Sequence, residues 1–221
     1  MTIEIPAFAG MTQKTMNHSK ILISGSLAFD VIFSIPIDFR KSIPLDNGKI
    51  RSFNASYTAN GKNEFPGGTG GNIAFWLGED GVPCSLFSAW GKDFSEKKYR
   101  QKLEKLGVEI HGKEGDFTAH AYMISDPLHQ QLIIWQPNAY KFHDEISLHE
   151  YFSKEELKNF GYALFGAGSP KSIEKHISEF RQQNKTAIVI FDPGQVTPIF
   201  SKKSFQKCCK NSDILRYSHW K

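Results

Sequence analysis

The sequence has no long hydrophobic run, few cysteines and no charge of one dominant sign. No stretch approaches the roughly 18 consecutive apolar residues that a membrane-spanning helix needs, so we expect no membrane partner. Cys84, Cys208 and Cys209 cannot all pair, and adjacent cysteines rarely form a disulfide, which favours a reducing, cytoplasmic setting. The net charge of +4 is scattered along the chain and forms no basic stripe, so nucleic acid is not an expected partner.

Several catalytic patterns are also missing. The eight histidines and three cysteines show no metal-ligand spacing, and no G-x-S-x-G motif of a hydrolase occurs. No glycine cluster is followed by the Gly-Lys-Ser/Thr of a P-loop. The sequence therefore predicts no metal site, and it gives no support to a hydrolase or a P-loop enzyme.

What is present is the composition of a folded protein. Apolar residues make up 40% of the chain and include 18 phenylalanines, and 221 residues are enough for one domain with a substantial core. The first residues carry Glu4 and a proline where a signal peptide would be basic and apolar. We predict that residues 1–19 are a disordered extension, with Met11 or Met16 as alternative starts, and that residues 20–221 form the domain.

Apolar runs and amphipathic stretches alternate along most of the chain. Strands are predicted at Ile21–Ser24, Leu27–Ile37, Cys84–Ala89, Tyr162–Phe165, Ala187–Phe191 and Ile214–Leu215. Helices are predicted at Ile73–Leu77, Phe94–Leu106, Pro170–Gln183 and Ser201–Cys209, the first of them buried. Two further strands, Ala119–Ser125 and Gln131–Gln136, flank a turn and predict a hairpin. The alternation predicts a parallel sheet with helices on its faces.

The glycine cluster Gly67–Gly71 can be interpreted in three ways. Glycine allows close approach to a ligand and also allows a hinge. A dinucleotide-binding loop fits poorly, because Ile73 stands where the third small residue should be. A tight turn that caps a helix and a ligand-binding loop both remain open at this point.

Two other segments lie at strand ends, where open α/β sheets bind ligands. The segment Gly166-Ala167-Gly168-Ser169 could present backbone N–H groups to a phosphate. Ser169 before Pro170 is more typical of a helix N-cap. The segment Asp192-Pro193-Gly194-Gln195 is either a ligand contact or a simple turn.

Taken in order, several motifs resemble one family. They are Gly25-Ser26-Leu27-Ala28-Phe29-Asp30, Gly67-Gly68-Thr69-Gly70-Gly71-Asn72 and Trp90-Gly91-Lys92-Asp93-Phe94, with weaker matches at Phe117–Ala121 and Phe191–Gln195. Together they resemble the ribokinase-like, or PfkB, carbohydrate kinases, and within them the adenosine kinase and related nucleoside or sugar kinase branch. The resemblance covers Lys20 to about Leu215. It implies a three-layer α/β sandwich with a central, mostly parallel sheet and a small β lid, whose strands would fall within 30–39 and 119–136.

The resemblance also implies a substrate site. Asp30 would accept hydrogen bonds from hydroxyl groups of a nucleoside or sugar, Gly67 and Gly68 would let the lid hinge, and Asn72 would hold another hydroxyl. A carboxylate facing two vicinal hydroxyls forms charge-assisted hydrogen bonds, which favours a ribose-like ligand. The alternatives are that Asp30 is an edge or turn charge and that Asn72 caps a helix.

The family transfers a phosphoryl group from ATP with magnesium, and part of that machinery has no counterpart in this sequence. The family's D-T-x-G-A-G-D motif is absent, and Gly166-Ala167-Gly168 lies too early and is followed by Ser169 in place of the catalytic Asp. Residues 216–221 also lack the family's N-x-x-E motif. We therefore expect a C-terminally truncated kinase with no catalytic residue of its own and most of the ATP and Mg²⁺ site missing, so that a separate C-terminal kinase fragment is a possible partner. The alternatives are a non-catalytic nucleoside- or sugar-binding module and, with little support, a nicotinamide-dependent oxidoreductase.

Overall fold

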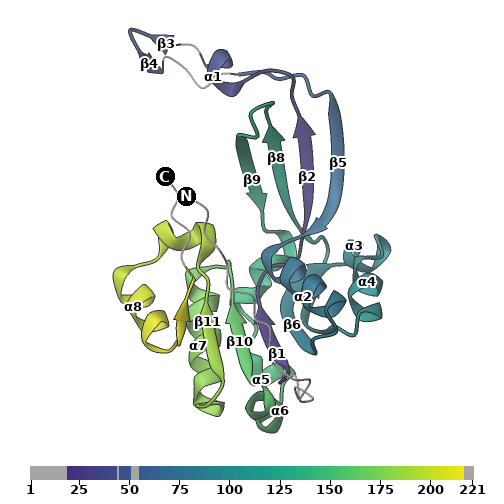
Figure 1. The fold of residues 1–221 in the computed structure, drawn as a ribbon, viewed down its shortest axis with the longest axis vertical. Coiled ribbons are helices and arrows are strands. Elements are labelled where there is room, and N and C mark those ends of the chain that lie inside the picture. The colour runs from purple at the N-terminus through teal and green to yellow at the C-terminus, as the bar shows by residue number, and fades with distance from the viewer. Residues whose placement is uncertain (1–18, 44, 51–54, 217–221) are drawn as a thin grey trace, which may run out of the picture.

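The structure is a computed structural model that describes residues 19–43, 45–50 and 55–216. The expected N-terminal extension therefore lies outside the described residues except for Ser19, as do residues 217–221. The described chain has two parts, an α/β body and a smaller sheet that projects from one end of it (Figure 1). We call this smaller sheet, strands β5, β2, β8 and β9, the lid.

The body is built on a sheet of six strands in the order β12-β11-β10-β1-β6-β7, and every neighbouring pair is parallel. The strands are β1 (Ile21–Ser24), β6 (Cys84–Gly91), β7 (Glu109–Gly115), β10 (Tyr162–Phe165), β11 (Ile188–Phe191) and β12 (Ile214–Leu215). Strand β6 is buried along its whole length, as expected for a near-continuous apolar run inside a parallel sheet. Strand β7, at the edge, was not predicted, because its residues are mostly polar and only partly buried.

Helices cover both faces of this sheet. They are α2 (Thr69–Glu79), α3 (Asp93–Glu96), α4 (Tyr99–Lys105), α5 (Leu148–Tyr151), α6 (Lys154–Asn159), α7 (Pro170–Gln183) and α8 (Lys202–Lys210), with the 3-10 helices η1 (Asn138–Asp144) and η2 (Gly194–Ile199). Leu22 joins a core with helices α5 to α8, whereas its neighbour Ile23 joins a second core with α2 and α4. Successive strand residues thus point to opposite helix layers. This confirms the predicted three-layer α/β arrangement with a parallel sheet.

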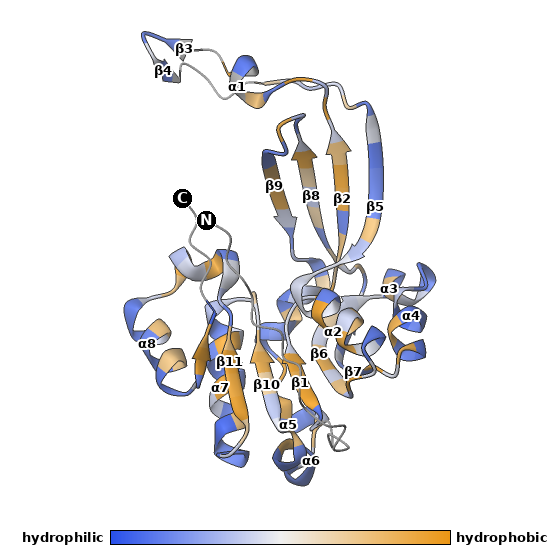
Figure 2. Cartoon of the chain, in the orientation of Figure 1, coloured by the Kyte–Doolittle hydropathy of each residue, from blue (hydrophilic) through white to orange (hydrophobic). Residues whose placement is uncertain are grey.

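The lid has the order β5-β2-β8-β9, with bounds β2 (Ala28–Ser34), β5 (Gly61–Gly67), β8 (Ala119–Ser125) and β9 (Gln131–Gln136). Strand β2 pairs antiparallel with β5 and parallel with β8, and β8 and β9 form the predicted antiparallel hairpin. Figure 2 shows β2 and β9 as largely hydrophobic, β8 as mixed and β5 as mostly hydrophilic. Strand β2 reaches into the predicted range 30–39 and ends at Ser34, but it begins earlier, at Ala28, and the short helix α1 (Phe39–Ser42) follows. Beyond it lies a small ribbon of β3 (Leu45–Asp46) and β4 (Lys49–Ile50).

Two helix predictions need correction. The helix expected over Phe94–Leu106 is broken into α3 and α4 by Lys98, whose φ of 61° is left-handed and cannot continue a helix. The run Ile73–Leu77 is helical but not fully buried, because α2 packs only one side on the sheet and leaves Trp76 66% exposed. Helix α7 has the predicted bounds, with Ser169 accepting a hydrogen bond from the Ser172 N–H and Pro170 at the first position.

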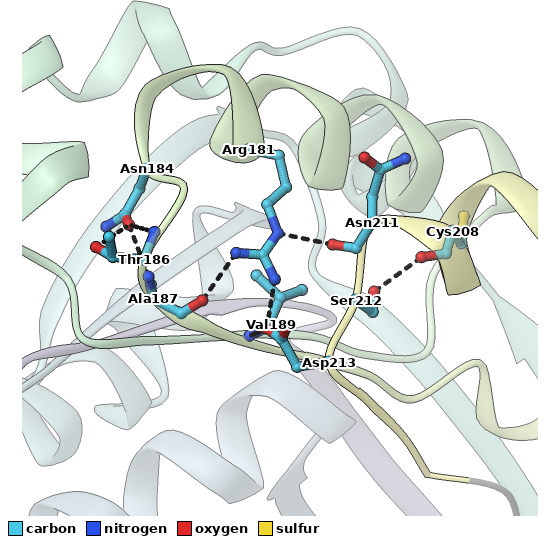
Figure 3. Close-up of polar contacts among 9 residues, drawn as sticks. All are labelled: Arg181, Asn184, Thr186, Ala187, Val189, Cys208, Asn211, Ser212 and Asp213. Atoms are coloured by element: carbon cyan, nitrogen blue, oxygen red, sulfur yellow. Dashed lines mark hydrogen bonds and ion pairs between the residues drawn. The ribbon is translucent and has the colours of Figure 1, made fainter.

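The last β-strand of the body is held by one arginine (Figure 3). The Arg181 guanidinium of α7 donates to the carbonyls of Asn211 and Ala187, both at 2.8 Å, and pairs with the Asp213 carboxylate. Asp213 in turn accepts from the Val189 N–H of β11 at 2.8 Å. These bonds fasten the turn between α8 and β12 to the strand beside it.

Two further findings bear on the predictions from composition. Cys84, Cys208 and Cys209 are all free thiols. Among the described residues, no helix combines the length and apolar character required to cross a membrane.

Candidate active site

A cleft of about 730 Å³ lies between the lid and the body. Its floor is made by the loops that follow the carboxyl ends of β1, β10, β11 and β12, the usual place for ligands in open α/β sheets. Its roof is one face of the lid. The lining residues are Ser26, Asp30, Gly68, Thr69, Asn72, Ala121, Met123, Ile133, Trp135, Pro137, Tyr140, Lys141, Asp144, Ala167, Gly168, Ser169, Asp192, Gly194, Gln195, Val196, Ile199 and Arg216.

Asp30 lies in the middle of the lid and not at its edge. Its strand β2 has a neighbour on each side, and the register places Asp30 beside Ala121, which pairs with Trp135 on β9. All three line the cleft, so they share the face of the lid that looks toward the body. Partial burial raises the pKa of the Asp30 carboxyl above its usual value.

Gly67 and Gly68 lie next to Asp30 with different roles. A Cβ atom on Gly67 would lie closer than 3.0 Å to the Asp30 carboxylate, so the missing side chain makes room for that carboxylate. Gly67 does not itself line the cleft. Gly68 does, and its φ of 84° and its close approach to the Ser26–Ala28 backbone require glycine at this position.

Asn72 lines the cleft from the first turns of α2 and is exposed. The alternative that Asn72 caps this helix is wrong, because the helix begins at Thr69 and Gly68 is the N-cap. The Thr69 N–H donates to the Ser26 hydroxyl at 3.0 Å, and the Gly71 N–H donates to the Ser26 carbonyl at 3.0 Å. Ser26 therefore fixes the start of α2 against the end of β1.

The floor contains both segments that the sequence left open. Ala167, Gly168 and Ser169 line the cleft while Ser169 also caps α7, so the capping and cleft positions coincide. Asp192 forms a turn by accepting from the Gly194 N–H at 3.1 Å, and its other oxygen pairs with Arg216 at 2.5 Å. Asp192 is 4% exposed, whereas the Arg216 side chain is 70% exposed at the mouth of the cleft.

The motif Trp90–Phe94 lies outside the cleft and has a structural role. Asp93 accepts from the backbone N–H and the hydroxyl of Thr118 at 2.8 and 2.6 Å, and the same hydroxyl accepts from the Gly91 N–H at 3.0 Å. A side chain on Gly91 would collide with the Phe117–Thr118 backbone. These contacts join the end of β6 to the start of β8 and so anchor the lid to the body.

Sequence reasoning missed the part of the cleft that η1 and β9 supply. Trp135 lies next to the end of β9, and Tyr140, Lys141 and Asp144 follow on η1. No periodicity marks a 3-10 turn of this kind. The sole available signal was the position of the segment directly after the hairpin.

Few cations and no cluster of metal-ligating side chains occur in the part of the chain that the structure describes. Across residues 19–43, 45–50 and 55–216, no three or more His, Cys, Asp or Glu side chains come together to hold a metal ion. The cations that line the cleft are Lys141 and Arg216, and Arg216 is already paired with Asp192. The carboxylates of Asp30, Asp144 and Asp192 line the same cleft, so its negative groups outnumber its cations, which disfavours a triphosphate there.

Comparison with known proteins defines the class. A profile of pfkB family carbohydrate kinases matches residues 49–219, which is most of the chain. The chain belongs to this family, whose ribokinase-type members are nucleoside and sugar kinases.

Two curated relatives are archaeal nucleoside kinases. The enzyme of Methanothermobacter thermautotrophicus is 26% identical over 156 residues, which cover 69% of this chain and 48% of the relative. The enzyme of Methanocaldococcus jannaschii is 25% identical over 199 residues, which cover 89% of this chain and 59% of the relative. The chain thus spans about half to three fifths of the length of these relatives.

Solved structures show the same fold. The M. jannaschii nucleoside kinase, an archaeal member of the ribokinase family, superposes with a TM-score of 0.71 at 23% identity and covers 89% of this chain and 60% of its own. Burkholderia thailandensis nucleoside kinase in complex with inosine superposes with a TM-score of 0.71 at 23% identity, and the match covers 88% of this chain and 59% of that structure. Ribokinase from Cryptococcus neoformans in complex with ADP superposes with a TM-score of 0.61 at 20% identity, and the match covers 89% of this chain and 56% of that structure. The ribokinase-like fold expected from the sequence motifs is therefore confirmed.

Proposed function

We propose that this chain is the acceptor-binding part of an ATP-dependent phosphotransferase that acts on a ribose-type hydroxyl, with an adenosine or related nucleoside as the preferred acceptor and a free sugar as the second choice. The nucleoside kinase relatives support the class, and the inosine-bound neighbour supports a nucleoside ligand. The cleft volume lies within the range typical of small-molecule sites, roughly 300–1,000 Å³.

The observation that carries the proposal is the position of the Asp30 carboxylate. It faces a cleft of the right size from the centre of the lid, with Gly67 leaving space for it. A carboxylate oxygen pair matches two vicinal hydroxyls as donors, and partial burial strengthens such charge-assisted bonds. Asn72 offers an amide to a further hydroxyl from helix α2. In this proposal Met123, Ile133 and Trp135 provide an apolar surface for a base.

We further propose that the 221-residue chain by itself binds the acceptor without turning it over. ATP would supply the phosphoryl group and the family's magnesium would neutralise its charge, and in this proposal a separate segment holds both. Tyr162, Ile188 and Ile214 are between 38% and 48% exposed on the body sheet. A separate segment carrying the D-T-x-G-A-G-D motif would cover this apolar surface and complete the site.

The test is calorimetric titration of the 221-residue chain with adenosine, inosine and ribose. We expect Asp30→Asn to weaken nucleoside binding roughly 10- to 100-fold, the usual size for hydrogen bonds to a charged group. The matched control Asp116→Asn removes an exposed carboxylate outside the cleft and should bind as the wild type does. Equal affinity of Asp30→Asn and wild type would contradict the proposed role of Asp30.

A coupled assay for ADP tests the second half of the proposal. The pure chain should give no nucleoside-dependent ADP release, and detectable phosphorylation would show that the idea of a binding part without turnover is wrong. Turnover restored by the C-terminal portion of a related nucleoside kinase supports the kinase proposal. Binding with no turnover in that mixture supports the non-catalytic binding module.

A further inference from the structure

Tyr140 combines deep burial with an unsatisfied polar group. The residue is 6% exposed, and its hydroxyl has no hydrogen-bond partner within the described part of the chain. Buried hydroxyls are nearly always paired, because leaving one away from water without a partner is destabilising. An unpaired hydroxyl at a ligand cleft is therefore a candidate for a contact that a ligand completes.

Tyr140 lines the cleft, and its hydroxyl is buried beside Gly168. A Cβ atom on Gly168 would be 2.7 Å from it, so the absence of a side chain at Gly168 leaves the space that the phenol occupies. The ring also meets Trp135 edge to face, with centroids 6.1 Å apart. Tyr140, Gly168 and Trp135 all line the cleft, and they come from η1, the β10–α7 loop and β9. Tyr140 thus stands where the lid hairpin meets the floor.

The ring of Tyr140 is held in place from behind. It stacks on His143 with centroids 4.9 Å apart and planes at 19°. The Nε2 atom of His143 is 3.3 Å from the Ser24 hydroxyl, which is 3.0 Å from Nδ1 of His176. Nε2 of His176 lies 3.0 Å from the Ile146 carbonyl and so must donate to it, which leaves Nδ1 to accept from Ser24. The phenol is therefore backed by a polar network that joins β1, η1 and α7, the kind of support that a precise ligand contact requires.

The surroundings select the kind of ligand atom. Asp144 lies on the same turn, lines the cleft and accepts a hydrogen bond from the Ser169 hydroxyl. Burial, followed by the negative charge of Asp144, raises the pKa of Tyr140, so the phenol stays protonated. A nearby carboxylate repels phosphate, so this corner favours an uncharged oxygen or nitrogen.

We infer that the Tyr140 hydroxyl is a further acceptor-binding group, which hydrogen-bonds an uncharged oxygen or nitrogen of the nucleoside when the nucleoside occupies the cleft. The inference rests on the proposed function, since it adds a contact to the site of Asp30 and Asn72. It assigns the η1 corner of the cleft to binding, a role that none of the motifs in the sequence indicated.

The variant Tyr140→Phe removes only the hydroxyl and gives two readouts. Removing an unpaired buried hydroxyl should raise the Tm of the ligand-free chain by roughly 2–8 °C. Tyr99→Phe should lower Tm, because the Tyr99 hydroxyl donates to the Gly67 carbonyl at 3.1 Å. In calorimetric titration with inosine and adenosine, Tyr140→Phe should bind about 5- to 20-fold more weakly than wild type. The reason is that the wild-type ligand gains a hydrogen bond and gives the unpaired hydroxyl a partner, whereas the variant has no hydroxyl there. Tyr151→Phe, outside the cleft, should bind as wild type.

The outcomes separate the inference from the proposed function. A raised Tm together with weaker binding supports the inference. A lowered Tm would mean that the hydroxyl has a partner inside the protein, and unchanged affinity beside a wild type that binds nucleoside would mean that it does not touch the ligand. Either result overturns the inference and leaves the proposed function standing. A wild type that binds neither nucleoside overturns both.

Discussion

The body and the lid use strands in opposite ways. In the body, all eight residues of β6 are buried between helices. In the lid, all six residues of β9 are exposed, and six of the seven residues of β5 are exposed as well. Four consecutive apolar residues of β9 are between 38% and 58% exposed: Leu132, Ile133, Ile134 and Trp135. The body buries most of its apolar strand residues and exposes some only on β10 to β12, whereas the lid leaves much of its apolar surface exposed.

This difference indicates a division of labour. A sheet covered by helices on both faces is stable without a ligand, whereas a single sheet with open faces gains stability from what it binds. The lid carries Asp30, and the body carries Ser26, Asn72 and the floor loops. The site exists only where the two parts meet, so substitutions should separate into those that affect folding and those that affect binding.

The largest expected effect is on folding of the body. Phe180 is fully buried and packs on Phe165, with ring centroids 5.9 Å apart. Phe180→Ala should lower the free energy of unfolding by about 3–5 kcal/mol. The lid counterpart Leu132→Ala, at a position 52% exposed, should cost under about 0.5 kcal/mol. Urea unfolding of both variants measures this, and equal losses would show that the lid has a core of its own.

The second effect is a pH dependence that arises from two buried histidines of the body. Burial lowers the pKa of His143 well below its usual value and that of His176 to about 3. Their folded-state pKa values lie below that of the unfolded chain, near 6.5, so acid favours the unfolded state, which binds the protons. Stability is therefore fully present above pH 6.5 and is lost as pH falls below it. Between pH 7.5 and 5.5 we expect a loss of about 1.4 kcal/mol for each histidine.

Urea unfolding at these two pH values provides the measurement. The variant His149→Gln changes an exposed histidine on α5 and should keep the same difference. A free energy of unfolding that does not change between pH 7.5 and 5.5 would mean that the buried pair is protonated in the folded chain.

The sequence predicts the elements that have a strong local pattern and misses those that depend on distant partners. The strands β1 and β10 and the helix α7 have the predicted bounds, because each combines a strong apolar pattern with a clear beginning or end. Strand β5, with the sequence Gly-Lys-Asn-Glu-Phe-Pro-Gly, has no β-branched residue and forms only because β2 pairs with it. The contact between His143 and His176 likewise joins residues that are distant in the sequence, so no sequence pattern predicts it.

The site was partly predictable for a similar reason. Asp30, Gly68 and Asn72 do line the cleft, and Gly67 leaves room for the Asp30 carboxylate, but it was the resemblance to a family that singled them out and not their spacing. Tyr140 and Asp144 follow no periodic pattern, and tertiary contacts alone bring them to the cleft.

The third effect is on nucleoside binding and not on folding. Gly67→Ala places a methyl group against the Asp30 carboxylate, which must move. We expect nucleoside affinity to fall at least about 10-fold, because a displaced carboxylate loses its charge-assisted bonds. Gly61→Ala on the same strand meets open space and has an ordinary φ, so it should bind normally. Calorimetric titration with inosine compares the two, and equal affinity would show that Asp30 tolerates the shift or plays no part in binding.

The smallest effect tests how the body holds the lid. Lys97, at the corner between α3 and α4, pairs with Glu64 on β5 and lies 4.4 Å above the Phe29 ring on β2. Both charges are partly exposed, so a double-mutant cycle of Lys97→Met and Glu64→Gln should give a coupling of about 0.2–1 kcal/mol that shrinks with added salt. The pair Lys92 and Asp116, at 3.4 Å and far more exposed, should give almost none. A coupling well above 1 kcal/mol would mean that this corner, more than the backbone pairing around Gly91 and Thr118, fixes the lid over the cleft.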